Sequence, residues 1–540
     1  MGMHSKLIRF LGLTLLLSLG ISLSSNAQIA HLQSVEYFNL IGGLNNTADS
    51  TLLAVNEASD LQNVIFSTAG GIEKRKGYTR INETQIGTTA TSTGITFYRQ
   101  SDGDRFLVAL WSNGTTDTIQ KMDYGVGTNG PDGTWDDITG SLGLTFADDE
   151  LDDFAQAEDE LYVAYGDGTR SLLNYTGTGN ATELTTLPDA TIVEFHKRIL
   201  WLAGRSDARS RVDFSNLDEP ELFTTTDFLL VETDDGQVIT GLKSALDCLY
   251  VFKTFSIWRI CGSDRDNITL EQMVRGVGAA GNPSIVLINN QFLFLTSDGD
   301  VAVYDGGITV KIISSKIEGT LNALNPGRFE QTVGLAFADG SGDEDYYLCV
   351  STEASGTHDL LLVYDTLFRA WTKFNNMPCN ALASYEVGTA QRAMAFVNYA
   401  GRTMRYPNTN ADDGGAFTAF YQSGHLQAGV PQQKVFHQFQ VLLRQQSSTA
   451  TLAFEYRIDF AAAGTTTNLS LAGTGAIWDV AIWDTDIYAD IASALRPVFM
   501  DLPGDFILWR VSDTSANPAF LLRGVRLWVE PTSRIGGSET

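Results

Sequence analysis

The chain has 540 residues, of which 43% are hydrophobic and 10% aromatic, which allows two to four domains with large cores and excludes a wholly disordered chain. Its 64 acidic and 36 basic residues give a formal net charge of −28, which argues against a protein that binds duplex DNA by neutralising phosphates over its general surface. The 51 Gly, 29 Phe and 18 Tyr beside only 12 Pro favour short strands joined by tight turns over helix bundles.

Residues 1–27 have the pattern of a secretory signal peptide. Two basic residues precede an apolar run over residues 10–23, and the small residues Ser25 and Ala27 stand where a signal peptidase needs them. The run is shorter than the roughly 20 residues that span a bilayer. We therefore expect export without a permanent membrane span, with a retained membrane anchor as the alternative.

Short apolar runs recur between residues 97 and 410, separated by Gly, Asp and Asn, with no amphipathic helix of useful length. The clearest unit predicts three strands, at residues 284–288, 291–296 and 300–304. Its middle strand is apolar on both faces, so both faces need to be covered by neighbours. Comparable units lie at residues 97–111, 152–175, 191–214, 238–261, 333–374 and 381–406.

Six or seven such units predict an all-β fold whose main part is a β-propeller of degenerate blades. Blades pack face to face around an axis, which buries both sides of their inner strands. Two stacked sandwiches are the alternative, although sandwich strands alternate more strictly than these do. We assign residues 97–410 to the propeller and expect residues 28–96 to form an N-terminal segment that joins it.

The pattern changes near residue 417 to strands with one polar face. Residues 451–460 alternate cleanly, and further strands are predicted at residues 434–444, 506–511 and 521–529. Residues 411–540 are therefore expected to form a C-terminal antiparallel β-sandwich. The Asp- and Gly-rich residues 408–415 are the predicted linker.

The four cysteines lack the spacing of a zinc site. If residues 245–253 and 256–261 form a hairpin, Cys248 faces Cys261. A cross-strand disulfide is then one interpretation for an exported chain, and two buried free thiols are the other.

No motif of common nucleophile, metal or nucleotide chemistry is present, and the chain has only six His. We therefore predict no catalytic, cofactor-binding or metal-binding residues and no enzyme. A carboxylate-based glycoside hydrolase stays open as an alternative, because its two acids need only be close in space.

Three charged segments are candidate ion or partner sites. Residues 339–345 resemble the start of a calcium loop, but Glu344 and Val350 replace its essential Gly and final acid, so we favour a solvated hairpin turn. The acidic residues 148–153 are predicted to form a charged loop. The basic cluster at residues 74–76 could touch a phosphate or an acidic partner, and we favour a solvated turn between strands.

Three segments near the start resemble the start of phage virion propeller proteins related to the tail nozzle (tail tubular B) and tail stabilisation proteins of short-tailed phages. They are FNLIGGLN at residues 38–45, EASDLQNV at 57–64 and GGIEKRKGY at 70–78. Later segments up to about residue 310 agree with this resemblance, which is carried by structural and turn residues.

The resemblance implies a non-enzymatic structural virion protein, a ring subunit that forms part of the DNA ejection conduit. Its expected partners are further copies of itself in a homo-oligomeric ring, the tail adaptor or other virion proteins, and passing DNA in transient contact, without sequence-specific binding. Acidic side chains lining a conduit repel phosphates, which lets DNA slide. The expected location is the virion. An exported bacterial propeller for adhesion or glycan binding, periplasmic or secreted, is the alternative that the signal peptide favours.

Overall fold

The computed structural model describes residues 32–532 apart from short gaps. The residues within that range that it leaves out are 88–89, 114–115, 125–129, 146–149, 166–169, 263–266, 340–342, 389–390, 430, 445–450, 472–492 and 517–519. The expected signal peptide lies outside the described residues. No helix among the described residues combines the length and apolar character needed to cross a bilayer.

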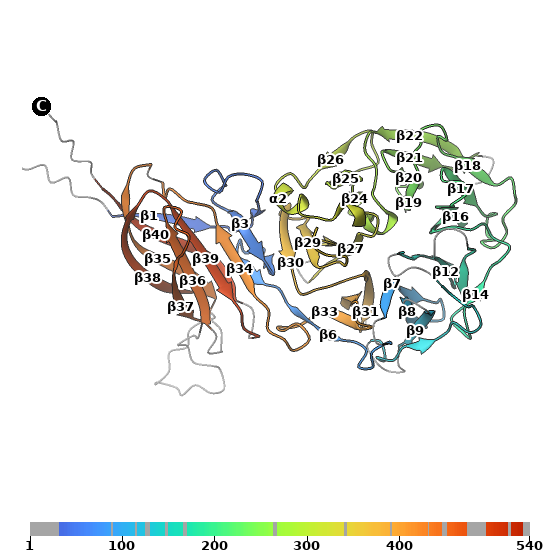
Figure 1. Ribbon diagram of the computed structural model, residues 1–540, viewed down its shortest axis with the longest axis horizontal. Coiled ribbons are helices and arrows are strands. Elements are labelled where there is room, and N and C mark those ends of the chain that lie inside the picture. Colours follow the sequence, from blue (N-terminus) through green and yellow to red (C-terminus); the bar gives the residue numbers. More distant parts are fainter. Residues whose placement is uncertain are drawn as a thin grey trace, which may run out of the picture.

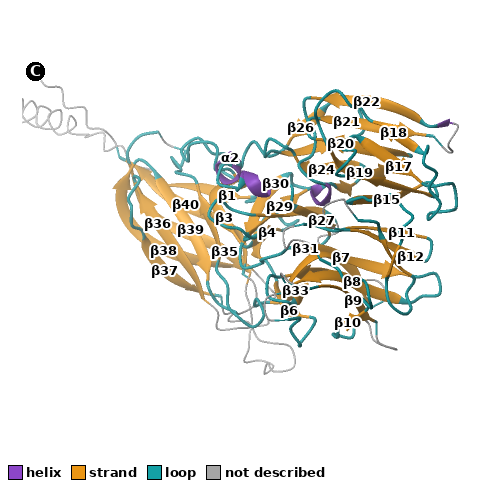
Figure 2. Cartoon of the chain, turned by 45° about the vertical axis from the view of Figure 1, so that its right-hand side comes forward, coloured by secondary structure: helices purple, strands orange, loops and turns teal. Residues whose placement is uncertain are grey.

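Seven four-stranded antiparallel sheets form a ring, and two six-stranded sheets form a second body beside it (Figure 1). The ring is a β-propeller, and we number its sheets as blades 1 to 7 in chain order. All seven units expected from the sequence fall in separate blades. Figure 2 shows the strands of the second body running next to the ring.

The first three blades each use four consecutive strands. Blade 1 contains β7 (Thr91–Arg99), β8 (Arg105–Ser112), β9 (Asp117–Asp123) and β10 (Asp136–Asp137). Blade 2 contains β11 (Asp153–Ala157), β12 (Glu160–Ala164), β13 (Leu173–Tyr175) and β14 (Thr182–Glu183). Blade 3 contains β15 (Ile192–His196), β16 (Ile199–Ala203), β17 (Arg211–Phe214) and β18 (Phe228–Leu230).

The next three blades follow the same scheme. Blade 4 contains β19 (Ile239–Ala245), β20 (Cys248–Lys253), β21 (Ser256–Cys261) and β22 (Thr269–Arg275). Blade 5 contains β23 (Val286–Ile288), β24 (Gln291–Leu295), β25 (Val301–Tyr304) and β26 (Val310–Ile312). Blade 6 contains β27 (Val333–Phe337), β28 (Asp345–Val350), β29 (Leu360–Asp365) and β30 (Ala370–Phe374). Short helical turns flank blade 5: η2 (Asn282–Ser284), α2 (Glu318–Leu321) and η3 (Pro326–Arg328).

Blade 7 closes the ring with a strand from far back in the chain. It contains β31 (Ala381–Val387), β32 (Gln391–Val397), β33 (Thr403–Thr409) and β6 (Gly77–Arg80). Strands β6 and β33 pair antiparallel, with Arg80 opposite Met404 and Thr79 opposite Arg405. The ring is therefore closed by backbone hydrogen bonds between two segments that lie far apart in the chain.

The apolar cores lie between neighbouring blades. On β12, Leu161 and Val163 pack toward blade 1, while Tyr162 and Ala164 pack toward blade 3. Because successive side chains of a strand point to opposite faces, a strand between two covered faces has to be apolar throughout. The same condition explains why β16, β20 and β28 are buried along their full length.

The second body is a sandwich built from both ends of the described chain. One sheet has the order β38 (Ser493–Gly504), β35 (Lys434–Arg444), β40 (Leu521–Pro531), β5 (Ile72–Lys74) and β4 (Val64–Phe66), with β1 (Gln33–Phe38) also paired to β40. The other has the order β2 (Gly43–Leu44), β3 (Glu57–Gln62), β34 (Ala419–Ser423), β39 (Ile507–Asp513), β36 (Thr451–Ile458) and β37 (Thr465–Ser470).

The N-terminal segment is divided between the two bodies, which differs from the expectation that residues 28–96 join the propeller. Strands β1 to β5 belong to the sandwich, and only β6 and the start of β7 belong to the ring. The sandwich partners of β1, β3 and β5 lie in the last part of the chain. A local hydrophobic pattern carries no information about partners so distant in sequence. The propeller is therefore inserted between the two halves of the sandwich.

Candidate binding site at the propeller axis

The first strand of each blade lies nearest the axis of the ring. Neighbouring first strands contact one another from β7 through β11 and β15 to β19, and again from β23 through β27 and β31 back to β7. The short helix η2 bridges the remaining step, since it contacts both β19 and β24. The starts of these strands therefore gather at one end of the axis.

A cavity of about 260 Å³ lies at this end and is lined by residues of blades 2 to 6. Its lining includes three carboxylates, Glu150, Asp153 and Glu330, and no Lys, Arg or His. Aliphatic side chains such as Ile192 and Val238 supply the remaining walls. The lining thus combines acidic and apolar side chains.

Asp153, at the start of blade 2, is held by the neighbouring blade 3. Its Oδ2 accepts a hydrogen bond from the backbone N–H of Val193 on blade 3, at 2.9 Å. Burial raises the pKa of Asp153 above its usual value, while nearby Lys243 and Asn282 act in the opposite direction. The carboxylate is therefore oriented in advance and lies beside a cation on blade 4.

Two further carboxyl groups, Asp152 and Glu194, neighbour Asp153 but do not line the cavity. Burial raises the pKa of Asp152 to about 8, and the hydroxyl of Thr93 on blade 1 donates a hydrogen bond to its Oδ2. Burial, opposed by Lys243, raises the pKa of Glu194 to about 7. Burial thus favours the neutral form of both carboxyl groups.

Several polar atoms of the lining have no hydrogen-bond partner. The side chain of Asn282 is 5% exposed, and its Oδ1 accepts the backbone N–H of Leu242 at 3.2 Å. Its Nδ2 makes no hydrogen bond of normal geometry, although it lies close enough to Asp153 to lower the pKa of that group. Thr240 Oγ1 and Gln331 Oε1 are likewise buried and unpaired. Buried polar atoms normally have partners, so these three atoms are exceptions within the fold.

The sequence-based interpretation of residues 148–153 as a charged loop does not describe Asp152 and Asp153. Asp152 is only 7% exposed, and Asp153 begins strand β11. Residues 148–149 lie outside the described part. Sequence reasoning missed the axial cavity because its lining residues come from five blades, and only the run of acids before an apolar strand hinted at it.

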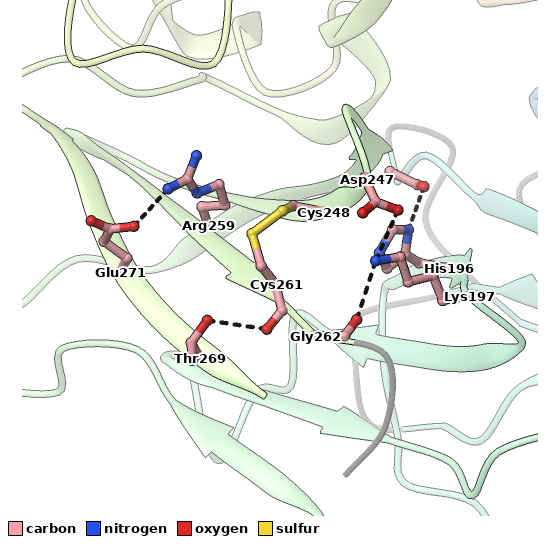
Figure 3. Close-up of a disulfide and its surroundings, with 10 residues drawn as sticks. His196, Lys197, Asp247, Cys248, Arg259, Cys261, Gly262, Thr269 and Glu271 are labelled. Atoms are coloured by element: carbon pink, nitrogen blue, oxygen red, sulfur yellow. Dashed lines mark hydrogen bonds and ion pairs between the residues drawn. A yellow bond between two sulfur atoms is a disulfide. The ribbon is translucent and has the colours of Figure 1, made fainter. Parts of the chain in front are cut away.

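Cys248 and Cys261 are joined by a disulfide across β20 and β21, with 4.6 Å between their Cα atoms (Figure 3). The hairpin has the register expected from the sequence, since Leu249 lies opposite Ile260 and Tyr250 opposite Arg259. This bond lies at the opposite end of the blade from the start of β19.

Blade 3 is tied to blade 4 next to this disulfide (Figure 3). The ammonium of Lys197 pairs with Asp247 at 2.9 Å and donates to the carbonyl of Gly262 at 3.3 Å. His196 Nδ1 shares a hydrogen bond of 2.7 Å with the hydroxyl of Ser244. These contacts hold blades 3 and 4 together, and the neighbouring disulfide joins two strands within blade 4.

A second disulfide joins Cys349 on β28 to Cys379, 30 residues further on. It fastens blade 6 to the segment that enters blade 7. The sequence gives no sign of this pairing, because Cys379 lies outside any hairpin whose register could be counted.

The basic cluster is not the solvated turn that we favoured. Lys74 and Arg75 are each 1% exposed, and only Lys76 faces solvent. Arg75 donates two hydrogen bonds to the carboxylate of Asp412, at 2.8 and 2.7 Å. Lys74 pairs with Asp513 at 3.0 Å. Lys74 and Arg75 are therefore paired with acids of the same chain and are not available to a partner. The predicted linker at residues 408–415 supplies one of these acids, Asp412.

The calcium-like segment is also only partly a solvated turn. Asp345 is 6% exposed, begins β28 and accepts the backbone N–H of Thr366 at 3.1 Å. Burial raises its pKa to about 8. Residues 340–342 lie outside the described part, and within the described residues no group of three or more acidic, His or Cys side chains is arranged to hold a metal.

No protein-family model matches the chain, and no curated protein matches it. Among solved structures, the N-terminal domain of Nup159 is similar at 10% identity and a TM-score of 0.37, covering 64% of this chain and 97% of that one. The WD40 domain of Neurospora crassa Pan2 has 11% identity and a TM-score of 0.37, with 62% and 97% covered. BBS1N, solved in complex with ARL6DN, has 10% identity and a TM-score of 0.39, with 63% and 99% covered. The likeness is one of fold alone.

Proposed function

We propose that this protein is a non-enzymatic structural component of a phage virion, a tail nozzle-like ring subunit that forms part of the DNA ejection conduit. The observation that carries the proposal is where the nozzle-like segments lie. Residues 38–45, 57–64 and 70–78 supply β2, β3, the first residue of β4, β5 and the start of β6, so they run from the sandwich into the propeller. The resemblance thus concerns the region where the chain passes between the sandwich and the propeller, near residues 75 and 412, which we call the joint.

The joint is built to hold its geometry. Arg75 is paired with Asp412, and its Nε donates to Asn63 Oδ1 at 2.9 Å. The guanidinium also lies 4.0 Å from the ring centre of Phe417. Both chain crossings between the bodies, near residues 75 and 412, are therefore fastened to each other. A rigid joint suits a subunit that keeps its place in an assembly while DNA passes.

The charge of the chain supports the same proposal. A formal net charge of −28 on a ring subunit creates a field that repels phosphates and so opposes adhesion of DNA to the conduit wall. Contact with DNA would then be transient and independent of sequence.

Export and ligand binding form the second candidate function, which the axial cavity favours. An exported propeller with a signal peptide could use the cavity for adhesion or for glycan binding. A hydrolase is less well supported, because Asp152, a carboxyl with a raised pKa, has both its oxygens buried or bonded to Thr93 and is closed to a substrate.

The experiment is the isolation of the protein with the particle that carries it. We expect mass spectrometry of purified virions to find the chain and electron micrographs of the purified protein to show rings. A stable monomer that never copurifies with virions would overturn the proposal. Sequencing of the mature amino terminus tests export, and glycan turnover that disappears in Glu194→Gln would establish the hydrolase instead.

A further inference from the structure

We infer that His437 is a proton-dependent clasp that holds the edge strand β38 to the sandwich, so that β38 loosens from its sheet as the pH rises. The clasp consists of His437 on β35, Asp501 on β38 and Glu530 on β40. The inference goes beyond the proposed function, because it concerns the sandwich sheet whether the chain belongs to a virion or is exported.

The backbone ladder is irregular on both sides of His437. The register of β35 shifts between Phe436 and Gln438 against β38 and also against β40. His437, between them, lies opposite no residue in either of these two ladders. On β38 the irregular stretch includes Asp501, whose φ of 116° is uncommon for a residue with a side chain. Side chains therefore tie the three strands together at this level.

Both ring nitrogens of His437 face a carboxylate. Nδ1 lies 2.6 Å from Oδ1 of Asp501, and Nε2 lies 2.9 Å from Oε2 of Glu530. A neutral imidazole has one N–H donor, whereas the imidazolium has two. Only the protonated ring can donate to both acids, and loss of its proton leaves one carboxylate facing a ring nitrogen without hydrogen. The clasp is therefore complete only when His437 is charged.

The cations of the strands around His437 are engaged elsewhere. On the same face of β40, Arg526 pairs with Glu36 of β1 at 2.5 Å. Arg496 of β38 donates to a backbone carbonyl of β37 at 2.9 Å. Lys434 of β35 itself is 0% exposed and donates to two backbone carbonyls. The charged groups that face the imidazole are thus the two acids of the clasp.

The acids of the clasp favour the charged form of the ring. The hydrogen bond with Asp501 raises the pKa of His437 above its ordinary value of 6.5, burial opposes this increase, and the hydrogen bond with Glu530 adds to it. Because the pKa is raised in the folded state, the clasp contributes its full stability below pH 6.5. That stability is lost as the pH rises through the raised pKa.

Strand β38 is the element that the clasp releases. It lies at the edge of its sheet and pairs only with β35, whereas β40 has neighbours on both sides (Figure 1). Its exposed side chains include Leu495, Phe499 and Leu502. Local opening begins where few contacts hold a segment, so the loss of a lateral tie affects β38 first.

The test is amide hydrogen exchange of β38 peptides in the full chain, between about pH 5.5 and about pH 9, in the wild type and in His437→Gln. The rates are corrected for the intrinsic pH dependence of exchange. We expect β38 to be roughly three- to fivefold better protected in the wild type at the lower pH, the scale of surface ion pairs, and equally protected at the higher pH. Because the two proteins share every other titrating group, their ratio isolates His437.

His425→Gln is the matched control. His425 follows β34 in the same sandwich, but its Nδ1 shares a hydrogen bond of 2.6 Å with the hydroxyl of Ser50, and burial lowers its pKa. This variant should leave the pH response of β38 unchanged. An equal change of that response in His425→Gln would overturn the inference.

Nuclear magnetic resonance of the chain with 13C-labelled histidine measures the pKa of His437 directly. We expect a value above 6.5, and Asp501→Asn and Glu530→Gln should each lower it. These two variants also decide if His437→Gln does not fold, since both should weaken the pH response of β38. A pKa of His437 at or below 6.5, or a pH response of β38 that persists in His437→Gln, would overturn the inference.

Discussion

Asp152 is a carboxyl group that the fold removes from water. Burial raises its pKa from 3.8 to about 8, so between these values the folded state keeps a proton that the unfolded state releases. Its contribution to stability is therefore complete below pH 4 and is lost as the pH rises through 8, by up to about 1.4 kcal/mol per pH unit.

Asp152→Asn should remove this dependence while keeping an acceptor for the Thr93 hydroxyl. We expect the variant to gain stability relative to the wild type between pH 5 and pH 9, measured by urea unfolding at several pH values. Asp136→Asn, at an exposed position, should leave the profile unchanged. Parallel profiles of the wild type and Asp152→Asn would contradict the assignment.

Arg75 makes the strongest set of contacts at the joint. Arg75→Ala leaves the Asp412 carboxylate buried without its partner, and loss of one member of a buried pair destabilises a protein by about 3–5 kcal/mol. Chemical unfolding should show this decrease. Lys76→Ala, at the exposed neighbour, should stay within about 0.5 kcal/mol of the wild type. Equal effects of the two substitutions would show that the ion pair is unimportant.

Contacts between individual residues were predictable where both residues lie in one hairpin, because the strand register then follows from counting residues. Cys248 and Cys261 belong to one hairpin, so counting residues places them opposite each other. The acids that pair with Arg75 and Lys74 lie 337 and 439 residues away, and no spacing rule connects them. A run of three basic residues has the same appearance whether it is buried or solvated.

Strand β6 closes the ring through a glycine that has no room for a side chain. A Cβ on Gly77 would lie 2.0 Å from the carbonyl oxygen of Ala411, a backbone atom that cannot move aside cheaply. Gly77→Ala should therefore separate β6 from β33 and destabilise the protein by several kcal/mol. Amide hydrogen exchange in blade 7 should accelerate.

Gly356→Ala is the control for this substitution, because nothing lies within 4 Å of its added Cβ. Amide hydrogen exchange in blade 7 of Gly356→Ala should match that of the wild type. Unchanged exchange in Gly77→Ala would mean that β6 does not hold the ring closed.

The two disulfides should stabilise the fold to different degrees. They close loops with sequence separations of 13 and 30 residues. The loss of chain entropy in the unfolded state predicts stabilisation of the folded state by about 3 kcal/mol for the shorter loop and about 4 kcal/mol for the longer one. Replacing Cys349 and Cys379 by Ala should therefore lower the unfolding midpoint more than replacing Cys248 and Cys261. Reaction of all four thiols with a labelling reagent in the absence of reductant would refute both bonds.

Strand patterns were predictable where each strand pairs with the next one in the chain. Residues 284–288 and 291–296 were expected as neighbouring strands and pair as β23 and β24, and Asn289 and Asn290 between them have the positive φ of a tight turn. Strands β2 to β5 are two to six residues long. They exist because of partners elsewhere, so their own residues carry too little pattern to reveal them.

The sandwich and the propeller share one hydrophobic core. A single cluster contains Leu293 and Leu348 of blades 5 and 6 together with Phe439 and Trp509 of the sandwich. We expect the two bodies to unfold together. Hydrogen exchange of peptides from β16 and β39 should give the same free energy of global opening, and two clearly different values would show that the bodies are independent.

The insertion of the ring between two halves of the sandwich affects how the chain can fold while it is being synthesised. At roughly 5–20 residues per second, β5 leaves the ribosome about 20–90 seconds before β40, the strand that pairs with its open edge. During that interval its open hydrogen-bonding edge has no native partner. Translation speed and chaperone supply should therefore influence the yield of this protein more than that of a chain whose domains follow one another.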